Sequence, residues 1–260
     1  ARPLLITFAD VGQGDAALIV TPEGKHILID AGPSAKAAER LFFESLMDTM
    51  DLVVTSHNHS DHIGGVPWVF ARFVVRAYME NGVPHTTAAY ASTLFGRRNE
   101  PGLLDLEPSA RTITVGSVTL RVLPPSGLDG SQNNNSVGIL LEYGNFRALF
   151  TGDSELKELE HWLRTYDIQR VHVLKGAHHG SSNGVTQRWI ERTRPASVVI
   201  SASATNEYGH PSPFVIRAWE QVGARVYVTS RDGRIHVVGY KDGRHTVYTD
   251  RNVLSAPIRK

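Results

Sequence analysis

The chain contains no cysteine among its 260 residues. This absence excludes disulfide bonds, Cys-X-X-Cys redox chemistry, thiol nucleophiles and zinc sites that need a thiolate ligand. Any metal site must therefore be built from histidine, carboxylate and amide side chains. An oxidising compartment permits disulfides without requiring them, so the missing cysteines leave the compartment open.

The sequence also lacks an excess of charge and long apolar runs. Its 27 lysine and arginine residues nearly balance 26 aspartate and glutamate residues, which gives a net charge of +1. This balance excludes a protein that coats a polyanion through bulk charge. No apolar stretch reaches the roughly 18 residues that a spanning helix needs, so no transmembrane segment is predicted. Because the chain begins at Ala1 rather than methionine, we expect an extracytoplasmic location, periplasmic or secreted, with the cytoplasm left open.

Strand and helix patterns follow one another without a low-complexity linker. The first strands are predicted at residues 4–9, 16–20 and 26–30. A helical pattern runs from Ser34 to about Met50, and residues 97–106 are predicted as a loop. These patterns predict an α/β (α+β) fold with two sheets and helices outside them. We expect one domain, residues 1–260, with two pseudo-equivalent halves that meet near residue 150.

The segment His57-Asn58-His59-Ser60-Asp61-His62 directly follows a short apolar strand pattern at residues 52–55. Its three imidazoles and one carboxylate are metal-binding groups within six residues of chain. Because the segment follows a strand, these side chains are expected on one loop at a sheet edge. The alternative is an exposed histidine-rich loop that binds no metal tightly.

Further ligands are expected at distant strand ends, because one loop cannot fill two coordination spheres. Asp153 follows a predicted strand at 146–150, and His178 and His179 follow a predicted strand at 171–174. Polar groups at the carboxyl ends of strands are where sites of α/β proteins gather. Asp153 has an alternative role as a helix N-cap, and both roles can hold at different lone pairs.

These motifs together resemble those of the metallo-β-lactamase superfamily. The resemblance rests on His57 to His62, Ile29-Asp30-Ala31-Gly32, Phe150-Thr151-Gly152-Asp153 and His178-His179-Gly180-Ser181. A narrower resemblance, to the ComEC/Rec2 DNA-uptake family and its stand-alone relatives, rests on Asp10-Val11-Gly12-Gln13-Gly14-Asp15, Asn133-Asn134-Asn135-Ser136 and Tyr208-Gly209-His210-Pro211. The motifs span residues 10–211.

The resemblance implies a four-layer αββα sandwich with two divalent metal ions, zinc or manganese, between the edges of its two sheets. The implied ligands are His57 and His59 for one ion, Asp61 and His62 for the other, Asp153 as the bridge, and His178. His179 would lie beside the metals without binding them, although these two neighbours could exchange roles. A metal-activated hydroxide would be the nucleophile, so no serine or cysteine nucleophile is needed.

The third motif departs from the wider superfamily. A histidine usually completes the first metal site there, whereas this sequence has Gln132 to Asn135. An amide oxygen is a harder and weaker ligand than an imidazole, so the first site is expected to bind its ion loosely or to accept manganese. We expect Asn134 near the metals, flanked by Asn133 and Asn135. The alternative is an asparagine-rich turn before the next strand.

Other side chains are expected around the metals. His210 would contact a phosphate oxygen or protonate a leaving group. Asp30 would order the ligand loop, while Gln13 and Asp15 would reach the same pocket from a glycine loop or merely satisfy a tight turn. The candidates for phosphate contact are Ser181, Arg97, Arg98 and Lys175. Histidines outside the motifs, such as His85, are expected to be surface or core residues.

The first function that fits these residues is a metal-dependent hydrolase, a phosphodiesterase or nuclease acting on DNA. Asp61, His179 and His210 are the residues expected in catalysis. The ComEC/Rec2 resemblance implies DNA as the substrate and a membrane DNA-uptake channel as a partner.

Two alternatives belong to other classes. One is a hydrolase of a small phosphodiester or ester such as a choline-phosphate ester. Its cationic substrate would need an aromatic pocket, for which the candidates are Trp68, Tyr90, Phe95 and Tyr208. The other alternative is a DNA-binding module that retains the ligand loop without turnover.

Overall fold

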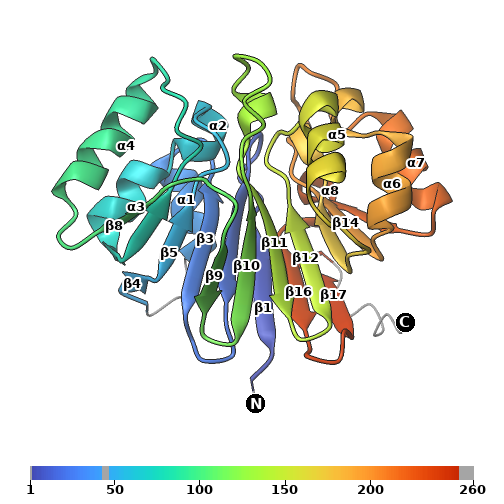
Figure 1. Cartoon of the computed structure of the whole chain (residues 1–260), viewed down its shortest axis with the longest axis horizontal. Helices are drawn as coiled ribbons and strands as arrows, with labels where there is room; N and C mark the ends of the chain where they lie inside the picture. Colours follow the sequence, from blue (N-terminus) through green and yellow to red (C-terminus); the bar gives the residue numbers. More distant parts are fainter. Residues whose placement is uncertain (1, 43–46, 252–260) are drawn as a thin grey trace.

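Two large β-sheets form the centre of the structure, and helices lie on their outer sides (Figure 1). The computed structural model describes residues 2–42 and 47–251. Within these residues, the two short strands β4 (Thr49–Met50) and β6 (Val74–Val75) form a third, parallel sheet.

The first large sheet has eight strands among the described residues. In spatial order these are β17 (His245–Thr249), β16 (Ile235–Gly239), β1 (Leu4–Phe8), β2 (Ala16–Val20), β3 (His26–Ala31), β5 (Leu52–Val54), β7 (Ala77–Met79) and β8 (Leu104–Leu106). Pairing is antiparallel from β17 to β3 and parallel from β3 to β8. The parallel part is the one that carries the ligand loop.

The second large sheet has seven strands in the same part of the chain. They are β15 (Arg225–Val228), β14 (Ser197–Ile200), β13 (Val173–Lys175), β12 (Phe146–Phe150), β11 (Gly138–Tyr143), β10 (Val118–Leu123) and β9 (Thr112–Val115). The strands from β9 to β12 pair as antiparallel neighbours, and those from β12 to β15 are parallel. Parallel strands end at one edge of a sheet, so the residues after β12, β13 and β14 meet there.

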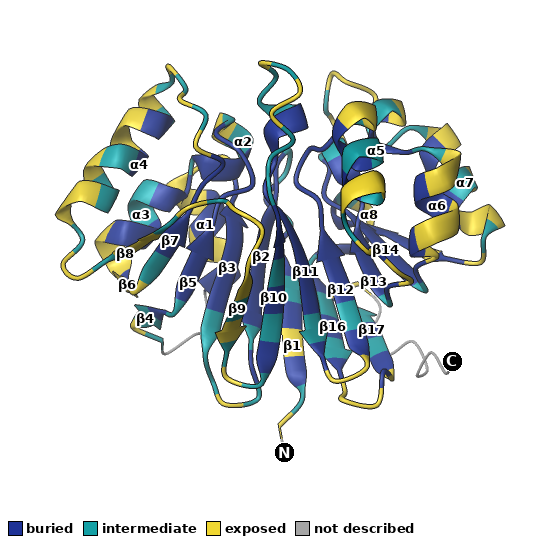
Figure 2. Ribbon diagram, viewed as in Figure 1, coloured by how far each residue is buried: buried dark blue, intermediate teal, exposed yellow. Residues whose placement is uncertain are grey.

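Helices cover the outer face of each sheet, which confirms the four-layer αββα sandwich. On the first sheet lie α1 (Ala35–Phe42), α3 (Val66–Arg72) and α4 (Ala88–Asn99). On the second lie α5 (Leu156–Thr165), α6 (Gln187–Thr193) and α7 (Pro213–Gln221). Figure 2 shows these helices exposed on their outer faces and buried toward the sheets. The fully buried indoles of Trp162, Trp189 and Trp219 fill the space under the second set of helices.

The main core lies between the inner faces of the two sheets. It joins β1, β2 and β3 of the first sheet to β10, β11 and β12 of the second. Phe8 and Phe150 stack across the interface with ring centroids 5.7 Å apart. Burying an aromatic ring of this kind contributes roughly 1.5–3 kcal/mol of hydrophobic stabilisation. This contact lies directly below the strand ends that carry the candidate ligands.

The chain changes sheets between Leu106 and Thr112 and again between Val228 and Ile235. Residue 150, expected to separate two halves, is the last residue of β12 inside the second sheet. The C-terminal hairpin of β16 and β17 completes the first sheet by pairing with β1. That residues 1–260 form one domain stays a prediction.

Two predicted elements differ from the structure. The helix expected from Ser34 to Met50 was wrong at its end, because Thr49–Met50 is strand β4, and residues 43–46 lie outside the described residues. The loop expected at 97–106 was also wrong, since α4 runs to Asn99 and Leu104–Leu106 is the edge strand β8. Three residues of strand are too short to give a periodic signal, and pairing with β7 decides their conformation.

His245 provides a test of the fold that is independent of the metal centre. This buried histidine of β17 packs against the rings of Phe146 and His172, with centroids 5.9 and 5.8 Å away. Burial, aided by His172, lowers the pKa of His245 from 6.5 to about 4. Between these values the unfolded chain binds a proton that the folded chain does not, so stability falls as pH falls.

We therefore expect acidification from pH 7 to pH 5 to lower the free energy of unfolding by up to about 2 kcal/mol through His245. Urea unfolding at both pH values measures this loss. A His245→Gln variant should lose correspondingly less stability over the same interval. An equal loss in the variant would contradict the assignment.

Candidate metal centre

The ligand loop starts where β5 ends, and Asp30 holds its beginning in place. The carboxylate of Asp30 accepts hydrogen bonds from the backbone N and the Oγ of Ser56, both at 2.7 Å. Asp30 is buried at the end of β3 with a positive φ of 56°. Burial raises its pKa, while the neighbouring His62 acts in the opposite direction. These contacts fix the backbone immediately before His57.

The short helix α2 (Ser60–Ile63) presents Asp61 and His62 from one turn. Nδ1 of His62 lies 2.9 Å from Oδ2 of Asp30, which orients the ring and leaves Nε2 to face the opposite side. Gly14 packs against the backbone carbonyl of Asp61, where any Cβ would collide with the oxygen. The glycine loop thus lies directly against the helix that carries two candidate ligands.

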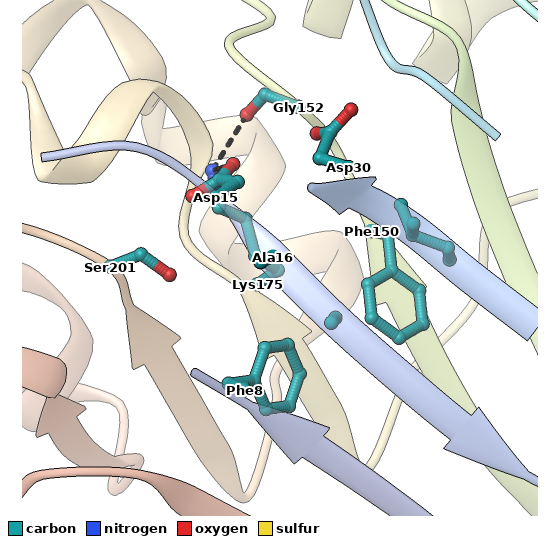
Figure 3. Close-up of a pocket in the computed structure, with 10 residues that line it drawn as sticks. Phe8, Asp15, Ala16, Asp30, Phe150, Gly152, Lys175 and Ser201 are labelled. Atoms are coloured by element: carbon teal, nitrogen blue, oxygen red, sulfur yellow. Dashed lines mark hydrogen bonds and ion pairs between the residues drawn. The ribbon is translucent and has the colours of Figure 1, made fainter. Parts of the chain in front are cut away.

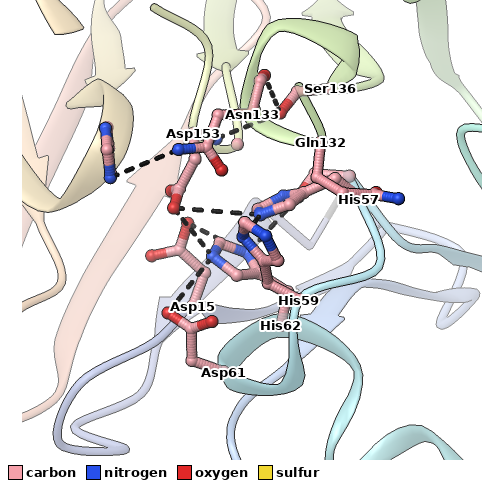
Figure 4. A network of polar contacts seen from close by, with 12 residues as sticks. Asp15, His57, His59, Asp61, His62, Gln132, Asn133, Ser136 and Asp153 are labelled. Atoms are coloured by element: carbon pink, nitrogen blue, oxygen red, sulfur yellow. Dashed lines mark hydrogen bonds and ion pairs between the residues drawn. The ribbon is translucent and has the colours of Figure 1, made fainter. Parts of the chain in front are cut away.

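Strands of the second sheet bring Asp153 and His179 to these side chains. Figure 4 shows Asp153 beside the imidazoles of the ligand loop. Nε2 of His179 lies 3.1 Å from Oδ2 of Asp61 and 3.3 Å from Oδ2 of Asp153. Nε2 of His62 also lies 3.3 Å from Oδ2 of Asp153. Each of these four residues offers one ligand atom within 4.8 Å of the other three. Two sheets therefore meet at one cluster of imidazoles and carboxylates.

His57 and His59 form a second pair of imidazoles at the same carboxylate. Nε2 of His57 lies 3.0 Å from Nδ1 of His59 and 3.9 Å from Oδ2 of Asp153. The carboxylate of Asp153 thus faces both imidazole groups, as a bridging ligand would. His85, expected outside the site, places its ring edge-on to His59 with centroids 5.5 Å apart. His85 comes from the loop before α4, which contains none of the sequence motifs, so no motif indicated its position beside His59.

The donor set fits divalent cations. In the described part of the chain, the buried atoms Nε2 of His62 and Oδ1 of Asp153 make no hydrogen bond. Imidazole nitrogen and carboxylate oxygen are ligands of zinc, and they also suit manganese. A second group of candidate ligands also lies together and consists of Asp15, Asp30 and His62. Ser56 already donates hydrogen bonds to the carboxylate of Asp30, and Lys175 pairs with the carboxylate of Asp15. We therefore interpret this second group as one that holds the first group in position.

The electrostatics keep Asp153 ionised and His57 neutral, as metal binding requires, whereas His179 carries a proton. Burial alone would raise the pKa of Asp153, but His179 and His62 hold it well below its usual range. Burial and the neighbouring His62 lower the pKa of His57, so its ring stays neutral. Burial would lower the pKa of His179, yet Asp153 and Asp15 raise it to about 10. A cation that binds here would displace that proton.

The structure places His178 and His179 in exchanged roles relative to the expected ones. Nδ1 of His179 donates to the backbone O of Ser201 at 2.9 Å, which leaves Nε2 to face Asp61 and Asp153. Nδ1 of His178 instead lies 3.1 Å from Oδ1 of Asn183 and 3.2 Å from Oε1 of Glu155. The candidate ligand is therefore His179, while His178 lies beside the cluster.

Lys175, expected to contact phosphate, is buried below the cluster instead. Its ammonium group pairs with Asp15 and donates to the backbone O of Gly152 at 3.0 Å (Figure 3). It also lies 3.7 Å from Oδ1 of Asp153. A buried lysine needs such partners because desolvation of a lone charge is costly. Lys175 thus contributes positive charge beneath Asp153. Arg97, another basic candidate, pairs with Glu80 at 2.8 Å and with Asp105 at 2.7 Å.

The asparagine loop supports the site from the side. Residues Asn133–Asn135 form a 3₁₀ turn before β11. Nδ2 of Asn134 reaches Asp129 at 3.3 Å and Glu155 at 3.4 Å, rather than a candidate ligand. Nδ2 of Asn133 donates to Glu155 at 3.1 Å and lies 3.5 Å from Nε2 of His178. The asparagine loop is therefore a hydrogen-bonded turn that lies beside His178.

The remaining candidates lie around the cluster. Ser181 donates its backbone N to the O of His178 at 2.8 Å. Oε1 of Gln13 accepts from the backbone N of Ser203 at 3.2 Å, which ties the glycine loop to the segment after β14. His210 packs its ring edge-on to His178 with centroids 5.5 Å apart. Burial and the adjacent His178 lower the pKa of His210, and its buried Nδ1 has no hydrogen bond within the described residues.

No helix among the described residues is long and apolar enough to cross a membrane.

Known proteins match the chain over most of its length. Residues 9–203 match the family described as the Metallo-beta-lactamase superfamily. The chain is 24% identical over 265 residues to ComE operon protein 3 of Bacillus subtilis (strain 168), an alignment that covers 94% of this chain and 34% of that protein. It is 27% identical over 241 residues to Recombination protein 2 of Haemophilus influenzae, covering 90% and 28%. The chain spans about a third of the length of these curated relatives.

A solved structure shows the same fold. The metallo-beta-lactamase fold protein YhfI from Bacillus subtilis has a TM-score of 0.58 and 12% identity, with 90% of this chain and 99% of that chain covered. The relatives bear out the resemblance to ComEC/Rec2-like proteins that the motifs indicated. The chain therefore belongs to the metallo-β-lactamase superfamily.

Proposed function

We propose that this protein is a metal-dependent phosphodiesterase, a nuclease that cleaves DNA with two divalent ions, zinc or manganese. The observation that carries the proposal is the position of Asp153. Its Oδ2 lies 3.3 Å from Nε2 of both His62 and His179 and 3.9 Å from Nε2 of His57. One carboxylate thus serves two sets of imidazoles. The names of the curated relatives, ComE operon protein 3 and Recombination protein 2, support DNA as the substrate.

Two divalent ions bound here would lower the pKa of a shared water and offset the charge of an attacked phosphate. The chain itself supplies the geometry. Asp61 is the most open member of the four-residue cluster, with 31% of its side chain exposed, so a substrate approaches from its side. His210, beside His178 with its Nδ1 free of hydrogen bonds in the described chain, contacts a phosphate oxygen or protonates the leaving oxygen.

We also propose that the protein acts outside the cytoplasm, on DNA presented by a membrane DNA-uptake channel. The support is the similarity to the ComE operon and recombination proteins, of which this chain matches about a third. A channel partner would place the single strand near Asp61. Co-purification of the chain with the remaining part of such a protein tests this association.

A cleavage assay tests the proposed activity. Single-stranded and double-stranded DNA are incubated with the protein in Mn²⁺ or Zn²⁺, and parallel samples contain a chelator. We expect cleavage that depends on the added ion and is abolished by the chelator, because both ligand groups need a cation to act. Intact DNA with every ion, or cleavage that survives chelation, would refute a metal-dependent nuclease.

The choline-phosphate alternative gains no support from the aromatic side chains. Trp68 packs against Phe42 and Phe73, with ring centroids 5.8 and 5.6 Å away. Tyr90 is buried within the same helical layer. The rings of Trp68 and Tyr90 therefore pack in the helical layer on the outer face of the first sheet. Tyr208 instead stacks on His210 near the candidate ligands. The four aromatic residues do not gather into one cation-binding pocket.

A further inference from the structure

The loop that follows β14 is built as a rigid support beside the metal centre. The side chain of Asn206 organises it: Nδ2 donates to the backbone O of Ser203 and of His210, both at 2.6 Å. Oδ1 of the same residue accepts from the backbone N of Tyr208 at 3.2 Å and of His210 at 2.9 Å. One amide thus closes the loop on itself through four hydrogen bonds.

The same loop is attached to the segment that carries the candidate ligand His179. The backbone N of Ser212 donates to the O of Gly180 at 2.9 Å. Gly180 packs closely on Pro211, whose Cβ would lie 2.6 Å from a Cβ added at this glycine. The position of the loop relative to the ligand cluster is therefore defined by direct contacts.

Tyr208 stands on this loop with its ring open to solvent. Its residue exposure is 64%, although the ring stacks on His210 with centroids 5.8 Å apart and planes at 28°. His210 in turn packs edge-on to His178, whose ring centroid lies 6.2 Å from that of His179. A continuous series of rings thus leads from an exposed tyrosine to the candidate ligand.

An exposed aromatic ring on a rigid loop is a suitable surface for an unpaired nucleobase. Nucleobases stack on aromatic side chains with little dependence on sequence, because every base has a π-face. Bases in a duplex are already stacked and paired, so they do not offer this face. One side of the Tyr208 ring is covered by His210, which leaves the other side for a ligand.

We propose that Tyr208, backed by His210, is a stacking platform that binds one unpaired base of single-stranded DNA next to the phosphate at the metal centre. This proposal rests on the proposed nuclease function, and it identifies single-stranded DNA as the preferred substrate of the enzyme. Its contribution is to substrate binding, because Tyr208 lies outside the candidate ligand set.

Kinetics on two oligonucleotides test the platform. One is a single strand of thymidines, and the other carries abasic positions around its centre. We expect the wild-type protein to have a KM about tenfold lower for the base-bearing strand, as loss of one stacked base predicts. Tyr208→Ala should raise that KM to the abasic value with kcat little changed, and Tyr208→Phe should behave like the wild type.

A matched control is Tyr240→Ala. Tyr240 is also an exposed tyrosine, at 39%, but it lies in the turn between β16 and β17 and contacts Arg244. This variant should leave both KM values unchanged. Equal KM values of the wild type and Tyr208→Ala on both strands would overturn the platform.

A binding readout separates failure of the platform from failure of the nuclease proposal. The fluorescence of 2-aminopurine in a single strand is recorded at low temperature immediately after mixing with the metal-loaded protein. Stacking quenches this base, so we expect quenching by the wild type and Tyr208→Phe and none by Tyr208→Ala. Quenching without cleavage would support the platform and refute the nuclease. Cleavage with equal quenching by Tyr208→Ala would refute the platform alone.

Discussion

Replacing Asp153 with asparagine is expected to lower hydrolytic turnover by on the order of 10³-fold or more. Asparagine preserves the size of the side chain but removes the negative charge that faces His57, His62 and His179. A neutral amide would bridge two cations poorly, because it brings no charge to offset theirs. Rates of DNA cleavage in saturating Mn²⁺ measure the loss.

Asp242→Asn serves as the matched control. Asp242 is also a carboxylate, but it pairs with Arg244 in the exposed turn after β16. This substitution should leave turnover at the wild-type level. Thermal unfolding of Asp153→Asn with and without metal checks that the variant folds. A folded Asp153→Asn that retains wild-type turnover would show that the bridging carboxylate is not part of the chemistry.

The second large effect concerns two adjacent histidines. His179→Ala is expected to lower both metal affinity and turnover by at least about 10²-fold, because its Nε2 lies within ligand distance of the shared cluster. His178→Ala should cost far less, since the ring of His178 contacts Asn183 and Glu155. Metal affinity is measured by competition with a chromophoric chelator, and turnover is measured on single-stranded DNA.

The pair of variants controls for the general effect of removing an imidazole next to the site. Both changes remove the same group from neighbouring positions, and both native residues have positive φ angles of 45° and 52°. Backbone strain is therefore altered similarly in the two variants. If His178→Ala lost more metal affinity and turnover than His179→Ala, the ligand assignment drawn from the structure would be reversed.

Much of the candidate site is local in sequence, which is why it could be predicted. His57, His59 and Asp61 lie within one loop and one turn of helix, so any fold that places this loop at a sheet edge brings them together. The role of Asp153 could be predicted by a similar argument, because it follows β12 and parallel strands end at a common edge. The layers of the sandwich followed from the family resemblance of these same motifs.

Other features depend on contacts between residues far apart in sequence. The ligand role within the pair after β13 is set by Ser201, which holds His179, and by Asn183, which holds His178. Sequence periodicity does not indicate which of these two histidines is the ligand, because the backbone there is neither strand nor regular helix. Lys175 is another case, since its interior position became evident only from the pairing with Asp15.

We propose that side chains of both sheets bind two cations around one carboxylate. Anomalous diffraction from crystals of the manganese-loaded protein tests it most directly. We expect two peaks on either side of Asp153, one beside His57 and His59 and the other beside Asp61, His62 and His179. A single peak, or two peaks away from this carboxylate, would contradict it.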